Sequence, residues 1–205
     1  GVDAVRLVDR FYLGDPQIRG FDIRGIGPRV IRYPIDTSDP NNPVVITDRK
    51  QVTDDAIGGR YYYMTRAELQ LPLGAGARSM GLRPSIYVDA GAVWGVTRPN
   101  VISNPNGTSI PVRDVNGNAL YTDGAGNTTT NPIRQDGTAN TPLVNTIAPF
   151  KEEFLGNTPK PRVSVGFGVN WNSPFGPFRI DIAKALLKER GDDPKLITFN
   201  VGTQF

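Results

Sequence analysis

The side chains of this chain that could do chemistry are charged groups rather than nucleophiles. The 205 residues include no cysteine and no histidine, which excludes thiol catalysis, imidazole bases, and cysteine or histidine metal ligands. The most distinctive charged residue is Arg19, in the triplet Arg19-Gly20-Phe21. An arginine can bridge carboxylates through its planar fork of donors. On its own, the triplet is equally compatible with a surface loop.

Two carboxylates lie on matching faces of two expected strands. Glu68 and Asp89 belong to segments 60–71 and 85–91, in which apolar residues alternate with polar ones. Successive side chains of a strand point to opposite faces, so both carboxylates fall on the face opposite the apolar residues. The alternative is that Glu68 pairs near Arg66 while Arg19 faces water.

Composition by itself suggests a soluble domain. The mean hydropathy is −0.31, and no run approaches the roughly 20 apolar residues of a transmembrane helix. Barrel strands need apolar residues only at alternate positions, however, and 23 Gly and 18 Pro fit turns and barrel walls. The net charge of +3 is too small and scattered to indicate nucleic acid. Because Gly1 opens in mid-pattern, we expect a mature or truncated piece.

The last ten residues show the clearest alternation. Apolar or lipid-compatible residues occupy every second position, and small or polar residues lie between them. The chain ends on the aromatic Phe205, and this combination is typical of the closing strand of an outer-membrane β-barrel. The expected lipid-facing residues are Ile197, Phe199, Val201, Thr203 and Phe205, with Thr198, Asn200, Gly202 and Gln204 on the other face.

About five strands are expected in total. Besides 60–71, 85–91 and 196–205, the segments 162–171 and 178–183 alternate. Alternation alone does not separate a barrel from a soluble sandwich. The polar face of 178–183 carries Arg179 and Asp181.

The connections alternate between short and long. A tight turn is expected at 172–176 and a short Gly-rich one at 72–82, whereas 14–59 and 95–161 are long. Short and long loops alternate in outer-membrane barrels, and a loop as long as 95–161 is unusual in a compact soluble domain. Residues 183–190 contain good helix formers. We expect a strand that continues into an outer loop turning at 191–194, with a short helix as the alternative.

Several motifs together resemble one family. They are the segment 11–21 followed by Gly25-Ile26-Gly27-Pro28-Arg29, the pair Gly58-Gly59, the turn 173–177 and the ending 199–205. This combination resembles the C-terminal barrel of the BamA family of outer-membrane protein assembly factors. The resemblance covers nearly the whole chain apart from 95–161. Translocation-module proteins of the TamA type and two-partner-secretion transporters are similar as well.

The resemblance implies an all-β fold, a transmembrane antiparallel β-barrel in the outer membrane of a Gram-negative bacterium. This chain would supply about five strands of a sixteen-stranded barrel. Residues 1–59 would be an inward-folding loop, 60–94 two strands, 95–161 a long outer loop and 162–205 the last three strands.

The resemblance also implies roles for residues. The loop that carries Arg19 would fold into the lumen, where Glu68 and Asp89 would neutralise a guanidinium that is costly to desolvate. Gly20 would permit close backbone approach and Phe21 would pack against the wall. Trp94 and Trp171, near strand ends, would anchor at the membrane interfaces, with core packing as the alternative.

The implied function is that of an insertase. The final strand would pair poorly with the first, forming a lateral gate of which Ile197, Phe199, Val201, Gly202 and Phe205 are part. Unpaired backbone groups at the gate would template strands of unfolded barrel clients. Membrane lipids and assembly-complex lipoproteins are the other expected partners. No nucleic acid, cofactor, metal or catalytic residue is expected, and hence no enzyme.

Two further functions fit part of the pattern. A passive pore or nutrient-receptor barrel would explain the alternation and the terminal aromatic residue, but not the placement of Glu68 and Asp89 relative to Arg19. A soluble adhesin-like sandwich would fit the mean hydropathy.

Overall fold

The structure is a computed structural model that describes residues 5–72, 74, 80–174 and 176–202. The chain divides into two compact units. The first comprises Gly1–Ile31, Thr53–Val101 and Glu153–Phe205, and the second comprises Arg32–Val52 and Ile102–Glu152. Within the described part of the chain we find no apolar helix of membrane-spanning length.

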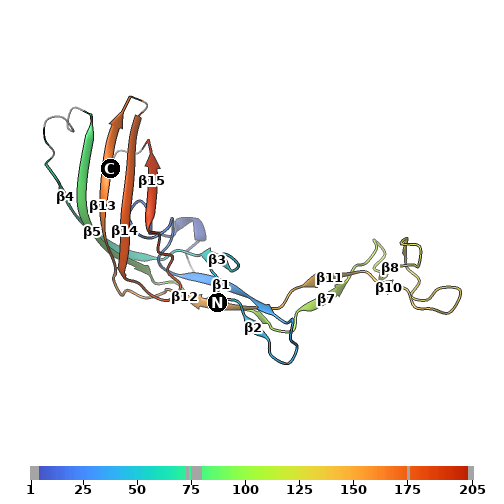
Figure 1. Cartoon of the computed structure of the whole chain (residues 1–205). Helices are drawn as coiled ribbons and strands as arrows, with labels where there is room; N and C mark the ends of the chain where they lie inside the picture. Colours follow the sequence, from blue (N-terminus) through green and yellow to red (C-terminus); the bar gives the residue numbers. More distant parts are fainter. Residues whose placement is uncertain (1–4, 73, 75–79, 175, 203–205) are drawn as a thin grey trace. The chain divides into compact units, whose positions relative to one another are not determined.

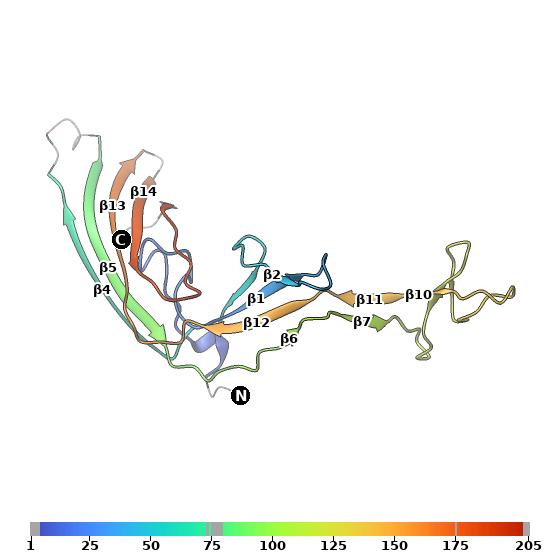
Figure 2. The same cartoon turned by 60° about the horizontal axis from the view of Figure 1, so that its bottom comes forward.

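The first unit is built on a five-stranded antiparallel sheet. Figures 1 and 2 show its strands side by side, in the order β15-β14-β13-β5-β4, curving together. The expectation of about five strands in an all-β fold is confirmed. The bounds are β4 Tyr61–Gln70, β5 Leu82–Trp94, β13 Arg162–Ser173, β14 Gly176–Leu187 and β15 Ile197–Val201.

The five strands are unequally paired. β13 pairs with β5 from Arg162↔Gly91 to Trp171↔Leu82, and with β14 over nearly its whole length. β15 pairs with β14 from Phe178↔Val201 to Ile182↔Ile197. One backbone hydrogen bond lies beyond each end of this ladder, between Ala183 and Leu196 and between Gly202 and Pro177. Among the described residues, β15 is the shortest strand of the sheet and has the shortest ladder. We call the end of the sheet at which β5 ends and β13 begins its outer end.

The two faces of the sheet differ as the alternation predicts. Arg179, Asp181 and Ala183 of β14 are buried, whereas Ile180 and Ile182 between them are exposed. In β15, Thr198 is buried while its apolar neighbours are exposed. Successive side chains of a strand point to opposite faces, so this sheet has an apolar outward face and a polar inward face.

Aromatic residues gather at both ends of the sheet. Trp94 lies against Tyr61 and Tyr63, with ring centroids 6.0 and 5.7 Å apart. At the opposite end, Trp171 lies 5.7 Å from Phe178. Aromatic residues at two levels are typical of segments that cross a bilayer.

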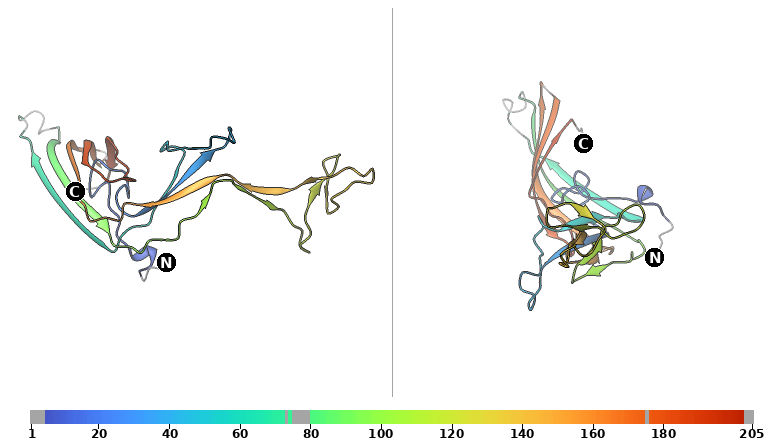
Figure 3. Two further views of the ribbon diagram at one scale, coloured as in Figure 1. Left: turned by 90° about the horizontal axis from the view of Figure 1, so that it is seen from below. Right: turned by 90° about the vertical axis from the view of Figure 1, so that its right-hand side faces the viewer.

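Residues 5–28 cover the inward face. The segment begins with a short 3-10 helix, η1, Leu7–Asp9, and continues without a further helix or strand. Its blue trace lies on the concave side of the sheet in Figure 3. A small hydrophobic core joins it to β5 and consists of Leu13, Ile18, Phe21, Ile26 and Val93. At Gly27, φ is +103° and a Cβ atom would lie 2.2 Å from Val93 Cγ1, so only glycine fits.

The second unit also contains strands. One sheet has the order β2-β1-β12-β6, β7 pairs with β11, and β8 lies between β9 and β10. The strand β3 falls in the first unit. The bounds are β1 Arg29–Asp36, β2 Val44–Val45, β3 Thr53–Ala56, β6 Ser103–Asn104, β7 Thr108–Pro111, β8 Tyr121–Thr122, β9 Thr128–Thr129, β10 Thr141–Pro142, β11 Val144–Ile147 and β12 Phe150–Leu155.

Short strands occur in both segments that the sequence suggested as long loops. Segment 1–59 contains β1–β3, and segment 95–161 contains β6–β12. Within segment 95–161, three hairpin turns start at Asp114, Asp123 and Arg134, and each ends in a glycine of positive φ. Such turns reverse the chain so that short strands can pair. The segment is rich in Asn and Gly, which suggested a loop, because these residues form the turns between its short strands.

Two smaller expectations concern β14 and the turns. β14 runs to Leu187, so residues 183–187 are strand rather than helix. The Gly-rich turn expected at 72–82 and the end of the chain, including Phe205, fall mostly or wholly outside the described residues.

The apolar outward face predicts a stability effect. We expect Ile180→Arg, near the middle of β14, to lower the free energy of unfolding by about 2–4 kcal/mol in a bilayer, because a cation at mid-depth is costly on a lipid-facing strand. Denaturant titration in lipid vesicles of the protein that contains this sheet measures it. Lys184→Arg, on the same face, is the control. Equal stability of the two variants would show that this face does not meet lipid.

Candidate functional site: the lumen loop and its charge network

Arg19 contacts both carboxylates named from the sequence. Its Nε and Nη2 atoms donate to Asp89 Oδ2 and Oδ1, each at 2.7 Å, and Nη1 donates to Glu68 Oε2 at 2.8 Å. The backbone amide of Arg19 also donates to Asp89 Oδ2, at 3.0 Å. Arg19 is 2% exposed. The arginine therefore faces the sheet rather than water, and its planar fork spans β4 and β5.

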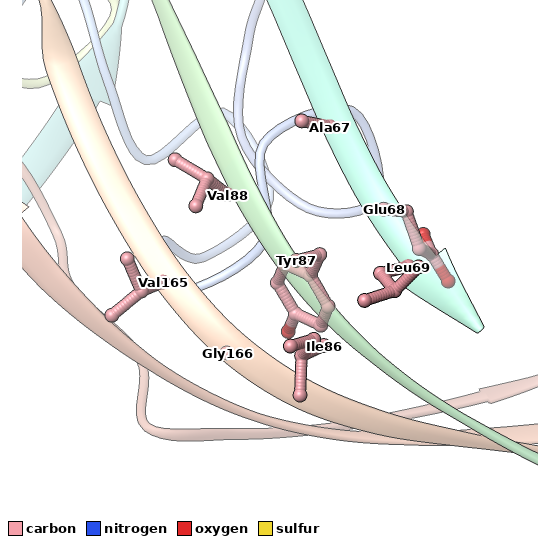
Figure 4. A pocket seen from close by; sticks show the side chains of 8 residues that line it. All are labelled: Ala67, Glu68, Leu69, Ile86, Tyr87, Val88, Val165 and Gly166. Carbon is pink, nitrogen blue, oxygen red and sulfur yellow. The ribbon is translucent and has the colours of Figure 1, made fainter. Parts of the chain in front are cut away.

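An aromatic ring also contacts the Arg19 guanidinium. The guanidinium carbon lies 3.3 Å from the ring centroid of Tyr87, within the range of a cation–π contact. Tyr87 is directly opposite Gly166 on β13, and a Cβ atom at Gly166 would lie 2.4 Å from Tyr87 Cζ. Figure 4 shows both residues in the wall of a pocket of about 570 Å³ over β4, β5 and β13. The missing side chain at Gly166 makes room for the ring.

Two further arginines join the network. Arg66 donates to Asp89 Oδ1 at 3.3 Å and to the carbonyl oxygens of Pro16 and Gln17 at 2.7 and 3.0 Å. It thus holds both the carboxylate and the backbone of the loop. The alternative that Glu68 takes Arg66 as its partner is not what the structure shows, since Glu68 meets Arg19 and Arg179.

Arg179 connects the network to β14. Its guanidinium donates to Glu68 Oε1 at 3.3 Å and, bidentately, to Asp181 at 2.7 and 2.9 Å. Glu68 therefore bridges an arginine of the loop and an arginine of β14. Sequence reasoning placed Arg179 and Asp181 on the polar face but did not assign them to the site. Their shared face was the signal that could have found them.

The network is electrically balanced. Three guanidinium groups meet three carboxylates, and a buried charge is tolerated only when it is paired and hydrogen-bonded. Burial alone lowers the pKa of Arg19, but the hydrogen bonds and charges of Asp89 and Glu68 outweigh it and raise that pKa above its ordinary value. The arginine stays charged, so the loop is held by permanent ion pairs.

Gly20 and Phe21 take the positions that the resemblance implies. Gly20 has φ +87°, and a Cβ atom there would lie 3.0 Å from Ser164 Cβ and 3.1 Å from Ala183 Cβ. Phe21 is fully buried in the hydrophobic core and forms a β-bridge with Pro194. The triplet thus packs directly on β13, β14 and the segment that precedes β15.

The gate-strand residues lie on β15 or just beyond it. Ile197, Phe199 and Val201 are each more than half exposed on the outward face. Gly202 follows the last residue of β15, with φ +77°, and its amide donates to the Pro177 carbonyl at 2.9 Å. Phe205 lies outside the described residues.

Asp15 connects the loop with β15. It is buried, and its Oδ1 atom has no hydrogen-bond partner within the described part of the chain. Burial raises the pKa of its carboxyl above the ordinary 3.8, although a hydrogen bond with Asn200 of β15 opposes this.

The ion pairs predict how the loop responds to substitution. Arg19→Met should leave Glu68 and Asp89 without their shared partner and cost about 3–5 kcal/mol of loop docking, as breaking a buried pair does. Arg19→Lys should cost less, because it keeps the charge and loses the fork. Hydrogen exchange of the backbone amides of residues 15–22 measures docking. The exposed Arg24→Met is the control, and wild-type protection in Arg19→Met would contradict the assignment.

Asp15 predicts a pH dependence. Its pKa is higher in the folded state, so the stability of docking falls as pH rises from the ordinary pKa through the raised one. We expect Asp15→Asn to stabilise the protein at neutral pH and to have little effect below pH 3.8. Denaturant titrations across pH measure this, with Asp9→Asn, an exposed carboxylate, as the control. A destabilised Asp15→Asn protein at neutral pH would show that the ionised form is favoured.

Comparison with known proteins gives the family. The model of the Omp85 superfamily domain matches residues 1–205. An outer membrane protein assembly factor BamA of Neorickettsia risticii is 27% identical over 202 residues, which is 98% of this chain and 17% of that protein. The BamA of Neisseria meningitidis serogroup B is 29% identical over 149 residues, 72% of this chain and 15% of that protein.

A solved structure is also similar. The crystal structure of BamA from Haemophilus ducreyi lacking POTRA domains 1–3 matches with a TM-score of 0.49 and 20% identity, over 94% of this chain and 26% of that chain. The chain spans about a sixth of the length of the two curated relatives. The family match and the curated relatives confirm the resemblance to the C-terminal part of a BamA barrel. This chain belongs to the Omp85 superfamily, as part of an antiparallel β-barrel of the Gram-negative outer membrane.

Proposed function

We propose that this chain is the seam-side part of an outer-membrane insertase, which folds and inserts β-barrel proteins through a lateral gate at β15. The family and its assembly-factor relatives support this proposal. The observation that carries it is the ladder of β15 on β14, the shortest of the sheet in the described part of the chain, with direct pairs from Phe178↔Val201 to Ile182↔Ile197.

A short ladder makes a strand easy to release. Each lost backbone pair exposes N–H and C=O groups, and exposed groups of this kind template an added strand. A client strand can therefore add at β15 by the same hydrogen bonds that close the barrel. In a bilayer, unpaired backbone groups cost several kcal/mol each, so the exchange of one partner for another is favoured over an open edge.

The lumen loop keeps the rest of the sheet rigid during this exchange. Arg19, Arg66 and Arg179 tie the loop to β4, β5 and β14, whereas β15 meets the loop through the hydrogen bond between Asp15 and Asn200. The loop therefore holds β4, β5 and β14 in place, whereas β15 has fewer contacts that prevent its movement. No covalent step is proposed, and the partners are unfolded barrel clients, outer-membrane lipids and accessory lipoproteins.

A disulfide across the seam tests the proposal. The chain has no cysteine, so Val201→Cys can be paired with one cysteine on the first barrel strand at a Cα separation that a disulfide allows. We expect the oxidised protein to stop inserting clients while keeping its folded barrel, and reduction to restore insertion. Client insertion into vesicles measures this.

The protein with Val201→Cys alone is the control for the substitution itself. Full insertion activity in the oxidised, locked protein would show that the seam need not open. A locked protein that still secretes or translocates a passenger would favour a two-partner-secretion or translocation role instead.

A further inference from the structure

The segment between β14 and β15 is held by a second buried ion pair, separate from the network of Arg19. Arg162, the first residue of β13, and Asp192, in the segment 188–196, both have fully buried side chains. Arg162 Nε and Nη2 donate to Asp192 Oδ2 and Oδ1, at 3.0 and 3.3 Å. A buried pair of this kind is specific in geometry and costly to break from one side.

The remaining donors of Arg162 bind backbone. Nη1 donates to the carbonyl oxygens of Thr158 and Lys160 at 2.9 and 3.1 Å, and Nη2 donates to that of Gly156 at 3.0 Å. The guanidinium therefore joins the segment before β13 to the segment before β15. Lysine, a point charge without the fork, could not make this set of bonds.

Asp192 is fixed from its own side as well. Its Oδ2 atom accepts a hydrogen bond from the backbone amide of Glu189 at 2.6 Å, which closes a turn in the segment 188–196. The carboxylate thus sets the shape of this turn and takes the charge of Arg162.

The next residues form a ladder with the lumen loop. The Asp22 amide donates to the Asp193 carbonyl at 2.8 Å, the Asp193 amide to the Gly25 carbonyl at 2.7 Å, and the Lys195 amide to the Gly20 carbonyl at 3.0 Å. The Lys195 ammonium also pairs with Asp22 at 3.1 Å. β15 begins two residues after Lys195, so the ladder ends where the strand starts.

We propose that Arg162 and Asp192 are positioning residues of the seam, which set the register of β15 on β14 by fixing its outer end. This rests on the proposed function, in which β15 is the movable strand. The register matters because β15 has few partners of its own: a short ladder discriminates weakly between registers, whereas the buried pair allows only one position. A shift by two residues keeps every side chain on its face, so alternation alone does not prevent it.

Paired cysteines report the register. Ile182 and Ile197 are direct partners, so Ile182→Cys with Ile197→Cys forms a disulfide in the native register. Ile180→Cys with Ile197→Cys is a diagonal pair, about 7–8 Å apart between Cα atoms, which is beyond the usual reach of a disulfide. It forms a disulfide efficiently only when β15 has slipped by two residues.

The test compares the two disulfides in Asp192→Asn, made in the whole membrane-inserted protein. We expect the ratio of slipped to native disulfide to rise about tenfold, because the loss of a charged hydrogen bond changes an equilibrium by at least that factor. Lys160→Gln, which breaks the exposed pair of Lys160 with Glu189 in the same region, is the control and should leave the ratio unchanged. General destabilisation would lower both disulfides and leave their ratio as it was.

A second variant covers the case in which Asp192→Asn does not yield a folded barrel. Arg162→Lys keeps the positive charge and loses the fork, and we expect its ratio to lie between those of the control and Asp192→Asn. A ratio equal to that of Lys160→Gln in the folded variants overturns the proposal.

The same samples separate this inference from the proposed function. The disulfide ratio reports the register of β15 whether or not the seam inserts clients. A raised ratio with unchanged client insertion would support the positioning role and count against the gate. An unchanged ratio, together with a seam disulfide that blocks insertion, would support the gate and count against the positioning role.

Discussion

The buried guanidinium of Arg19 is the constraint on which the rest of this sheet depends. A charge removed from water must be compensated, and Asp89, Glu68 and the ring of Tyr87 do so from two adjacent strands. Meeting these partners forces the loop into the concave side of the sheet. The same carboxylates then require Arg66 and Arg179, so one buried arginine accounts for a network that ties four elements together.

β15, the strand proposed as the gate, is attached differently. In the described part of the chain it has a short ladder, an exposed apolar face and a buried contact to the loop through Asp15. Its outer end, however, is fixed by Arg162, Asp192 and the ladder between residues 20–25 and 193–195. In the proposed gate, a strand anchored at one end and paired by a short ladder would separate and return to the same register. The strong attachment therefore lies at the outer end of β15, and the weaker one lies along its ladder with β14.

The second unit shows how composition can conceal structure. Asp114 and Asp123 accept hydrogen bonds from backbone amides two and four residues further on, and each turn closes at a glycine with positive φ. Asp and Asn side chains stabilise turns by such local bonds. The repeated turns bring short strands together, although none of these strands carries the apolar alternation that marks β13 or β14.

The sequence by itself determined the strand segments of the sheet, their faces and the parity that puts Glu68, Asp89, Arg179 and Asp181 on one side, because side-chain direction in a strand depends only on position. It did not place Arg19, for which water and the lumen both remained open until the family resemblance was added. Tertiary structure alone decided which carboxylate meets which arginine, and it revealed Arg162 with Asp192. The pairs of Arg19 and of Arg162 join residues that lie 30 or more positions apart, and local spacing carries no information about contacts at that range.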